Sequence, residues 1–268
     1  MTTNANGRKA IFITGAASGI GLATARRFAA EGWFIGLADI DAAGLKAAQA
    51  GLGAANCSVH ALDVRDRAAW TKAMTAFGKA SGGRMDALLN NAGIAHYGFL
   101  EDLTDDEVDR QLDINIKGVI NGARAGLALL KATPGSTLIN VASCAGLYGA
   151  PKMATYAATK FAVRGLSESL DVEYARLGVN VRCIMPWFVE TPILQAGSQG
   201  SNENIADLIR EGGQPVYTVE EAADVIWRSL QGPDLHWIVG KAGRQLRFAA
   251  RFMPGSIRKR MKTMAATS

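Results

Sequence analysis

The sequence predicts one α/β domain: a doubly wound parallel sheet of about seven strands with helices on both faces. Three observations lead to this prediction. Short apolar runs alternate with longer helical runs along the chain, as in a parallel sheet. The first apolar run leads through a glycine-rich turn into a helix. With 268 residues and 49% hydrophobic content, the chain can bury one large core. We expect this domain to span residues 1–240, followed by a tail at 241–268.

The elements follow from apolar periodicity, taken in order along the chain. Apolar runs of strand length lie at residues 9–13, 33–38, 86–89, 136–142, 179–185 and 235–239. A further run, the third along the chain, ends at Asp63-Val64. Helical runs lie at 22–31, 41–51, 66–80, 104–130, 153–177 and 219–230. A polar, glycine-rich segment at 190–217 lacks a clear period, and we expect a mobile lid there, the alternative being a surface loop.

The turn after the first strand is a candidate phosphate site. Gly15 would permit the tight turn, Gly19 the approach of backbone to phosphates, and Gly21 close packing of helix on strand. Backbone N–H groups at a helix N-terminus bind a pyrophosphate well. The spacing is G-x-x-x-G-x-G rather than G-x-G-x-x-G, and glycines also serve ordinary turns.

Ser143, Tyr156 and Lys160 form a candidate acid–base site. Tyr156 and Lys160 are spaced i, i+4, so they share one helix face, and the lysine should lower the pKa of the phenol. The Ser143 hydroxyl, at a strand end, could hold a substrate oxygen while the tyrosine moves a proton. Alone, Tyr-x-x-x-Lys could also be an accident of a helix surface.

Together the two patterns resemble the short-chain dehydrogenase/reductase family over roughly residues 8 to 240. Other family signatures occur in the expected order: Asp39, Asp63-Val64, the Asn90–Gly93 turn and Asn115. The resemblance implies a Rossmann-type fold and an oxidoreductase that acts on CH–OH groups. It implies that Tyr156 is the acid–base catalyst, that Lys160 also binds the nicotinamide ribose, and that Ser143 binds the reacting oxygen. Asn115 would hold a water linking Lys160 to solvent, or simply bond backbone.

Asp39 favours NAD over NADP. A carboxylate at the end of the second strand accepts bonds from ribose hydroxyls and repels a 2′-phosphate. NADP-preferring relatives usually have a basic residue at a position held here by Ile40 or Ser18. Asp63 would contact adenine, or is a turn carboxylate at a strand end. The cofactor-binding residues implied are Gly15, Ser18, Gly19, Ile20, Gly21, Asp39, Asp63, Val64, Asn91, Ala92, Gly93, Tyr156, Lys160, Pro186, Val189 and Thr191.

The chain departs from the family after the sixth strand, where Pro186-Trp187 replaces the usual Pro-Gly. Trp187 would either form a wall of the substrate pocket or pack beneath the lid. The other residues expected at the pocket are His96, Tyr148, Phe188 and Leu194. His96 would bind a distal polar group, or is a plain loop histidine. Because these side chains are mostly apolar, we expect a lipophilic secondary alcohol or ketone, such as a hydroxysteroid, a retinoid or an aryl-alkyl carbinol.

Other classes of protein fit less well. Redox-sensing or scaffolding relatives would not need Ser143, Asn115, Tyr156 and Lys160 together. Three widely spaced cysteines indicate neither disulfides nor a metal site. No apolar run approaches the roughly eighteen residues of a membrane span, and no signal pattern opens the chain, so we expect a cytoplasmic protein. We expect no nucleic-acid partner. Small residues in the 104–130 and 153–177 helices predict a homodimer or homotetramer.

The tail carries eight cations and no acidic residue. Leu246, Ala250, Met253 and Ile257 recur with helical spacing, which predicts a basic amphipathic helix broken near Pro254-Gly255. Three alternatives stay open: peripheral contact with the inner face of a membrane, packing on the protein or an oligomer partner, or closure of the pocket by Phe248 and Phe252.

Overall fold

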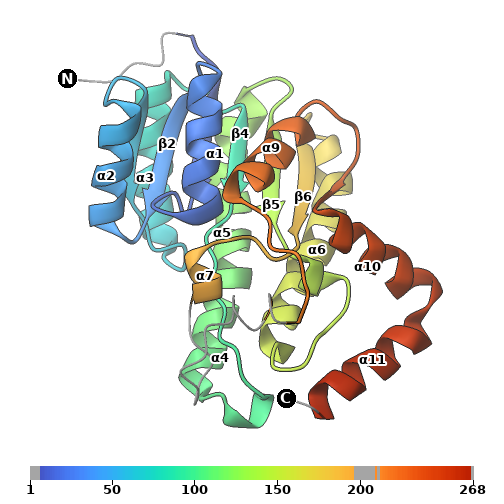
Figure 1. The fold of residues 1–268 in the computed structure, drawn as a ribbon. Helices are drawn as coiled ribbons and strands as arrows, with labels where there is room; N and C mark the ends of the chain where they lie inside the picture. Colours follow the sequence, from blue (N-terminus) through green and yellow to red (C-terminus); the bar gives the residue numbers. More distant parts are fainter. Residues whose placement is uncertain (1–6, 196–208, 210–211, 267–268) are drawn as a thin grey trace.

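The computed structural model describes residues 7–195, 209 and 212–266, and in this part of the chain seven parallel strands form one sheet. Their order is β3-β2-β1-β4-β5-β6-β7, which confirms the predicted fold class (Figure 1). The strands are β1 Ala10–Thr14, β2 Phe34–Asp39, β3 Cys57–Ala61, β4 Ala87–Asn90, β5 Thr137–Val141, β6 Asn180–Pro186 and β7 His236–Val239. β1 and β5 are buried along their whole length because helices cover both faces.

The helices divide between the two faces of the sheet. α1 Gly19–Ala30, α2 Ala42–Leu52 and α9 Val219–Ser229 pack on one face through a core that includes Phe28, Leu45 and Ile226. α3 Arg67–Ser81, α5 Gly118–Ala132 and α6 Ala154–Ala175 pack on the other, with Phe77 and Tyr174 in their core. The remaining helical elements are η1 Leu100–Asp102, α4 Asp105–Leu112, η2 Asp113–Lys117, η3 Cys144–Gly146, α7 Pro192–Gln195, α10 Lys241–Phe252 and α11 Pro254–Ala266.

The strand order places the candidate site. β1 lies between β2 and β4, so the chain winds outward in both directions from β1 and β4. In open parallel sheets, a crevice forms where the winding reverses, beyond the carboxyl ends of the strands. The glycine turn after β1, Asp39 at the end of β2, and the Asn90–Gly93 turn after β4 all belong to this edge.

Two predicted elements differ in detail. The single helix expected at 104–130 is divided by η2, a π-helical stretch, because a local widening accommodates Asn115 in the buried interior. The third strand ends at Ala61 rather than at Asp63-Val64. Asp63 instead turns the chain, since its carboxylate accepts from the backbone N–H of Arg65 at 3.0 Å.

Most of the expected lid, at 196–208 and 210–211, lies outside the described residues. Its described ends include α7 and a parallel bridge between Val189 and Tyr217. The tail forms two helices that meet at Met253, as the Pro254-Gly255 pair predicts, and they lie at one side of the molecule (Figure 1). In the described part of the chain, no helix is long and apolar enough to cross a membrane.

Candidate active site

Two glycines of the turn after β1, Gly15 and Gly21, have no room for a side chain. Gly15 adopts φ +68°, and a Cβ there would lie 2.7 Å from Asn91 Nδ2. A Cβ on Gly21 would lie 2.0 Å from the Gly15 carbonyl oxygen. Gly15 therefore supplies the positive φ, and Gly21 lets α1 pack against the turn, as predicted.

The N-terminus of α1 offers its first-turn N–H groups to a ligand. Ser18 is the N-cap, but its side chain makes no capping hydrogen bond. Gly19 and Ile20 open the helix, and uncapped N–H groups at this point attract anions. A turn that a Cβ would fill, leading into an uncapped helix start, fits the pyrophosphate of a dinucleotide.

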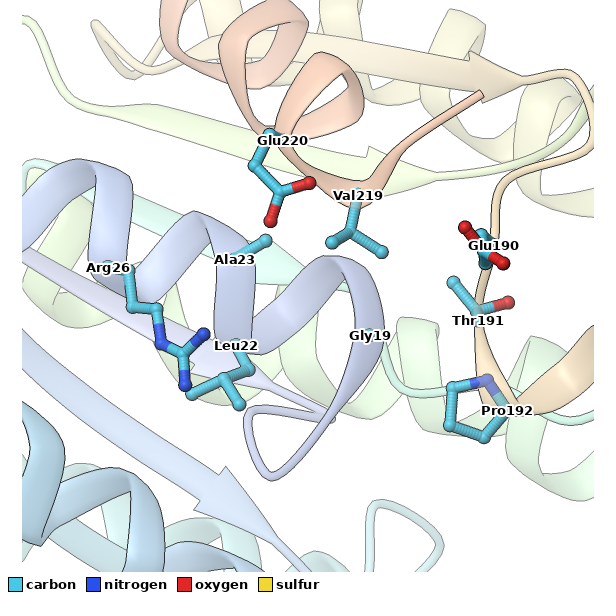
Figure 2. A pocket seen from close by; sticks show the side chains of 9 residues that line it. All are labelled: Gly19, Leu22, Ala23, Arg26, Glu190, Thr191, Pro192, Val219 and Glu220. Carbon is cyan, nitrogen blue, oxygen red and sulfur yellow. The ribbon is translucent and has the colours of Figure 1, made fainter. Parts of the chain in front are cut away.

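A pocket of about 200 Å³ lies beside this helix start (Figure 2). Thr191 and Pro192 face Gly19 across it, while Val219 and Glu220 come from α9. A Cβ on Gly19 would lie 3.3 Å from Thr191 Cγ2. Thr191 is therefore next to the glycine turn after β1, the candidate phosphate site, which we also call the phosphate turn. Before this segment, Pro186 ends β6 and Val189 is buried at the bridge to Tyr217.

Asp39 is fixed against the same turn. One carboxylate oxygen accepts from the backbone N–H of Ala17 and the other from that of Asp41, both at 3.0 Å. Each oxygen retains a lone pair for a further donor. The negative charge therefore has a defined position beside the glycine turn.

Asn91 links two turns of the site, and its expected contact with the cofactor stays a prediction. Its Nδ2 donates to the carbonyl oxygens of Thr14 and Gly15, at 2.9 and 3.3 Å. The Thr14 hydroxyl in turn accepts from the backbone N–H groups of Asn91 and Ala92. The Asn91 side chain thus ties the turn after β4 to the turn after β1. Sequence reasoning missed Thr14, which is the centre of this tie.

Asp63 and Val64 follow β3. The Asp63 carboxylate binds the Arg65 guanidinium, which holds the pKa of Asp63 below its usual value. This arrangement matches the alternative of a turn carboxylate. Val64 is buried, and its carbonyl oxygen accepts from Trp70 Nε1 at 3.0 Å. In the described structure both residues therefore stabilise the turn that follows β3.

The Ser143 side chain interacts with the Tyr156 hydroxyl and favours its ionised form. Ser143 follows β5 and caps η3, accepting from the backbone N–H of Ala145 at 3.1 Å. Burial raises the pKa of Tyr156 to about 12, and the interaction with Ser143 opposes the shift. At neutral pH the phenol is therefore protonated. The expected fall in the Tyr156 pKa is not found, since desolvation outweighs any effect of the lysine.

Lys160 lies one turn along α6 and is only 6% exposed. Its Nζ donates to the Val141 carbonyl oxygen at 3.1 Å and lies 5.6 Å from the centroid of the Tyr156 ring. Burial lowers the pKa of Lys160 to about 8. The amine is mostly charged at pH 7, and the carboxyl end of β5 holds it beside the tyrosine.

Asn115 projects from the π-helical stretch to the same centre. Its Oδ1 accepts from the Ile94 N–H, and its Nδ2 donates to the Ile94 carbonyl oxygen and to Thr159 Oγ1. A Cβ on Gly93 would lie 3.2 Å from Asn115 Oδ1 and 3.7 Å from Lys160 Nζ. Backbone bonding, one of the two expected roles of Asn115, is thus present, and the water-holding role stays a prediction. Thr159 was missed because its link is visible only in three dimensions.

The Tyr156 ring packs against an apolar cluster. Its members are Ala95, Tyr97, Met153, Tyr156, Phe188, Ile193, Leu194, Ile209 and Val216. Two predicted pocket residues, Phe188 and Leu194, belong to it. The Tyr97 ring lies 6.3 Å from that of Tyr156, and burial raises the Tyr97 pKa. We call these residues the apolar wall.

The other predicted pocket residues lie outside this wall. Trp187 packs against the cluster that contains Cys144 and Leu246, and its ring meets that of Phe188 edge-on, with the ring centroids 5.2 Å apart. His96 Nδ1 lies 3.5 Å from the Glu107 carboxylate. Tyr148 is half-buried in the loop after η3. The two roles expected for Trp187, a wall of the substrate pocket and packing beneath the lid, both stay predictions.

Cys144 follows Ser143, but its thiol is unreactive. Burial raises the pKa of its thiol to about 12, and its Sγ donates to the Met185 carbonyl oxygen at 3.4 Å. Since the thiolate is the nucleophile, a thiol with this pKa is inert. Among the described residues, no group of three or more His, Cys, Asp or Glu residues is arranged to hold a metal ion.

A phosphate turn, a fixed carboxylate beside it and a Ser–Tyr–Lys–Asn centre on one sheet edge define a dinucleotide-dependent oxidoreductase. The family model described as short chain dehydrogenase matches residues 9–202. The chain belongs to this family, which confirms the resemblance seen in the sequence, and it is an oxidoreductase of the class that acts on CH–OH groups.

Curated relatives of this chain are also named as oxidoreductases or dehydrogenases. Oxidoreductase UcpA of Escherichia coli strain K12 is 39% identical over 196 residues, covering 72% of this chain and 74% of the relative. The 3-alpha-(or 20-beta)-hydroxysteroid dehydrogenase of Mycobacterium tuberculosis strain H37Rv is 40% identical over 185 residues, covering 69% and 70%. This chain is similar to both over most of the catalytic domain.

Solved structures show the same fold. A short chain dehydrogenase/reductase from Burkholderia phymatum in complex with NAD has a TM-score of 0.82 at 26% identity, covering 97% of this chain and 96% of that one. A 3-ketoacyl-(acyl-carrier-protein) reductase from Brucella melitensis complexed with NADH has a TM-score of 0.76 at 29% identity, covering 87% and 98%. These neighbours support a nicotinamide dinucleotide as the cofactor of the fold.

Proposed function

We propose that the protein is an NAD-dependent enzyme that interconverts a lipophilic secondary alcohol and its ketone. One observation carries this proposal: the Tyr156 hydroxyl interacts with the Ser143 side chain, while the Tyr156 ring packs in the apolar wall. A proton donor framed by apolar side chains suits a substrate with one reacting oxygen and a large apolar body.

The residues divide the chemistry between them. A bound nicotinamide would supply or accept the hydride. In ketone reduction, Tyr156 gives its proton to the carbonyl oxygen, while the Ser143 hydroxyl donates a hydrogen bond to the same atom. In alcohol oxidation, Tyr156 removes the hydroxyl proton. Lys160 is charged below a pH of about 8 and favours the phenolate that forms in reduction.

The preference for NAD rests on Asp39. Because two backbone N–H groups fix its carboxylate, the charge cannot easily move away from a 2′-phosphate. Ile40, the next residue, is exposed and carries no charge to attract one. The neighbours solved with NAD or NADH are consistent with this proposal.

The substrate class rests on the apolar wall. Among its described members, none is Arg or Lys, so the wall offers no cation to a carboxylate or phosphate substrate. A hydroxysteroid, a retinoid or an aryl-alkyl carbinol would match it. The name of the mycobacterial relative, a hydroxysteroid dehydrogenase, adds support.

We also infer a symmetric oligomer formed through α5 and α6. Phe161 and Val172 on α6 are large apolar side chains left exposed in the single chain. Such residues, together with the small residues of α5, fit a helix-to-helix contact between two copies. Light scattering at micromolar concentration tests this, and a monomer alone would contradict it.

The proposed reaction is tested by a substrate screen. Secondary alcohols and ketones of rising lipophilicity are assayed with NAD(H) and with NADP(H), following absorbance of the reduced nicotinamide. We expect turnover with NAD(H), with kcat/KM rising as the apolar body grows. Turnover restricted to small polar or anionic substrates would contradict the substrate class, and a higher kcat/KM with NADP(H) would contradict the cofactor preference.

Asp39→Ala sharpens the test of cofactor preference. We expect the ratio of kcat/KM for NADP to that for NAD to rise by about 10- to 100-fold, because the repelling charge is gone. The ratio is the right measure, since losing the bond to the Ala17 N–H loosens the turn for both cofactors. Asp41→Ala removes a nearby carboxylate that caps α2 instead, and should leave the ratio unchanged.

A further inference from the structure

The outward face of α10 carries exposed aromatic rings. Phe248 and Phe252 are 61% and 63% exposed, and their ring centroids lie 4.8 Å apart. Met253 follows them and is 51% exposed. We call these three residues the tail patch. Phe248 and Phe252 do not cover Tyr156 in this structure. The exposed rings therefore argue against the expected alternative in which these two residues close the substrate pocket.

The opposite face of α10 is fixed to the body of the protein. Gly243 is buried, and a Cβ there would lie 2.5 Å from Cys144 Sγ and 2.7 Å from Ile238 Cγ2. Leu246 packs into the cluster that contains Trp187 and Cys144. The stripe expected from the sequence thus faces largely inward, with Leu246 half-buried and Ile257 buried. The helix cannot rotate to bury the tail patch without breaking this contact.

The tail helices that carry the tail patch are strongly cationic. All eight lysines and arginines from Lys241 to Lys262 are exposed, and the chain has no acidic residue after Asp234. Among the described residues, none of these eight side chains forms an ion pair with a carboxylate. On α10, Arg244 and Arg251 fall on the same outward arc of the helix as the two phenylalanines. The Arg251 guanidinium lies 5.8 Å from the Phe252 ring centroid.

We propose that α10 and α11 bind the surface of an anionic phospholipid bilayer. Phe248, Phe252 and Met253 would enter the interface, while the arginines contact headgroup phosphates. Charge complementarity selects this occupant. If two tails met about a two-fold axis, each would bring its unpaired cations against those of the other, which is unfavourable. A negatively charged lipid surface instead satisfies them all.

The contact of α10 with η3 places the tail patch near the catalytic residue Ser143 in the fold. η3 follows Ser143 directly, so a membrane on the outer side of α10 would lie on the same side of the molecule as that catalytic loop. A lipophilic substrate partitions into a bilayer and would be concentrated there. This consequence rests on the proposed function, whereas lipid binding itself does not.

The test is co-sedimentation of the full chain with vesicles. Vesicles of phosphatidylcholine with phosphatidylglycerol are compared with phosphatidylcholine alone at low salt. We expect binding to the anionic vesicles only. Phe248→Ala/Phe252→Ala should raise the lipid concentration for half-binding by about tenfold or more. Arg244→Gln/Arg251→Gln should raise it by about 30-fold, because each cation near the surface contributes about 1 kcal/mol.

Matched controls separate the patch from general charge and hydrophobicity. Lys72→Gln/Lys79→Gln removes two exposed cations of α3, and Leu100→Ala removes a 57% exposed apolar side chain of η1. Both should bind as the wild type does. Circular dichroism melts confirm that each variant is folded, without requiring any enzyme substrate.

Three results would overturn the proposal. The first is wild-type protein that stays in the supernatant with anionic vesicles at low salt. The second is a double phenylalanine variant that binds as tightly as the controls. The third is a smaller oligomer by light scattering in that variant but not in Leu100→Ala, which would assign the tail patch to a contact between copies.

Discussion

At the dinucleotide end of the site, polar side chains bind backbone groups, whereas at the proposed substrate end the wall consists of apolar side chains. Thr14, Asp39 and Asn91 hold the turns after β1, β2 and β4 in place through N–H and carbonyl partners. Around Tyr156, by contrast, Phe188 and Leu194 contribute only apolar surface.

The two ends should therefore respond differently to mutation. The cofactor surface, which is formed by the backbone of the turns after β1, β2 and β4, is held by hydrogen bonds. It tolerates almost no added atom, because the neighbouring backbone cannot move aside. A wall of side chains changes shape when one side chain is replaced, and the rest of the fold is little affected. Specificity for substrate can thus vary while the cofactor surface stays constant.

Tyr156→Phe should have the largest effect, because it removes the proton donor where the two ends meet. We expect kcat to fall by about 100- to 10,000-fold, with NAD(H) affinity within about twofold of wild type. Steady-state kinetics and fluorescence titration of NADH measure the two quantities. Tyr148→Phe, the same change in a neighbouring loop, should keep most of the rate. Retention of more than about a tenth of wild-type kcat by Tyr156→Phe would show that another group moves the proton.

Gly21→Ala tests whether the cofactor surface is rigid. The added Cβ would lie 2.0 Å from the Gly15 carbonyl oxygen, so the phosphate turn must shift. We expect NAD(H) binding to weaken by about 100-fold, measured by the same titration. Gly51→Ala is the matched control, since a Cβ on that helical glycine of α2 meets no atom within 4 Å. Equal affinities for the two variants would contradict a rigid cofactor surface.

Phe188→Ala tests the apolar wall. We expect kcat/KM for a bulky lipophilic ketone to fall by about 10- to 30-fold, because roughly 1.5–2 kcal/mol of apolar contact is lost. A small ketone that cannot reach the ring should lose less than about threefold in the same assay. If both substrates lost equally, Phe188 would be supporting the catalytic centre rather than contacting substrate.

Lys160→Met should produce the smallest effect, on stability. The unfolded chain keeps the Lys160 proton up to its ordinary pKa of 10.5, while the folded protein releases it near a pKa of about 8. Between these values the unfolded state binds more protons, so wild-type stability rises with pH, and the cost of burying the charge is fully present below pH 8.

Relative to Lys160→Met, the free energy of unfolding of wild type should therefore increase by about 1 to 3 kcal/mol from pH 7 to pH 10. Urea unfolding of the protein without added dinucleotide measures it. The same comparison with Lys72→Met, an exposed lysine of α3, should show no such trend. A flat difference for Lys160→Met would mean that Lys160 is solvated in the folded state.

Sequence determined the features that depend on local pattern. The glycine turn requires residues without Cβ atoms at fixed spacing, and Tyr156 and Lys160 share a helix face by periodicity alone. The alternation of apolar runs with helices was enough to predict the sheet, and the glycine turn together with Ser143, Tyr156 and Lys160 was enough to predict the family. It also placed the break between α10 and α11, because Pro254 cannot continue a helix from the preceding turn.

Tertiary structure decided what depends on distance across the fold. The tie from Thr14 to Asn91 joins residues 77 positions apart, and the Asn115–Thr159 bond spans 44. The upward shift of the Tyr156 pKa and the inward packing of Leu246 depend on burial, which composition does not reveal. Periodicity shows which residues share a face, but only the packed neighbours decide which face meets solvent, and burial in turn sets the pKa of each group.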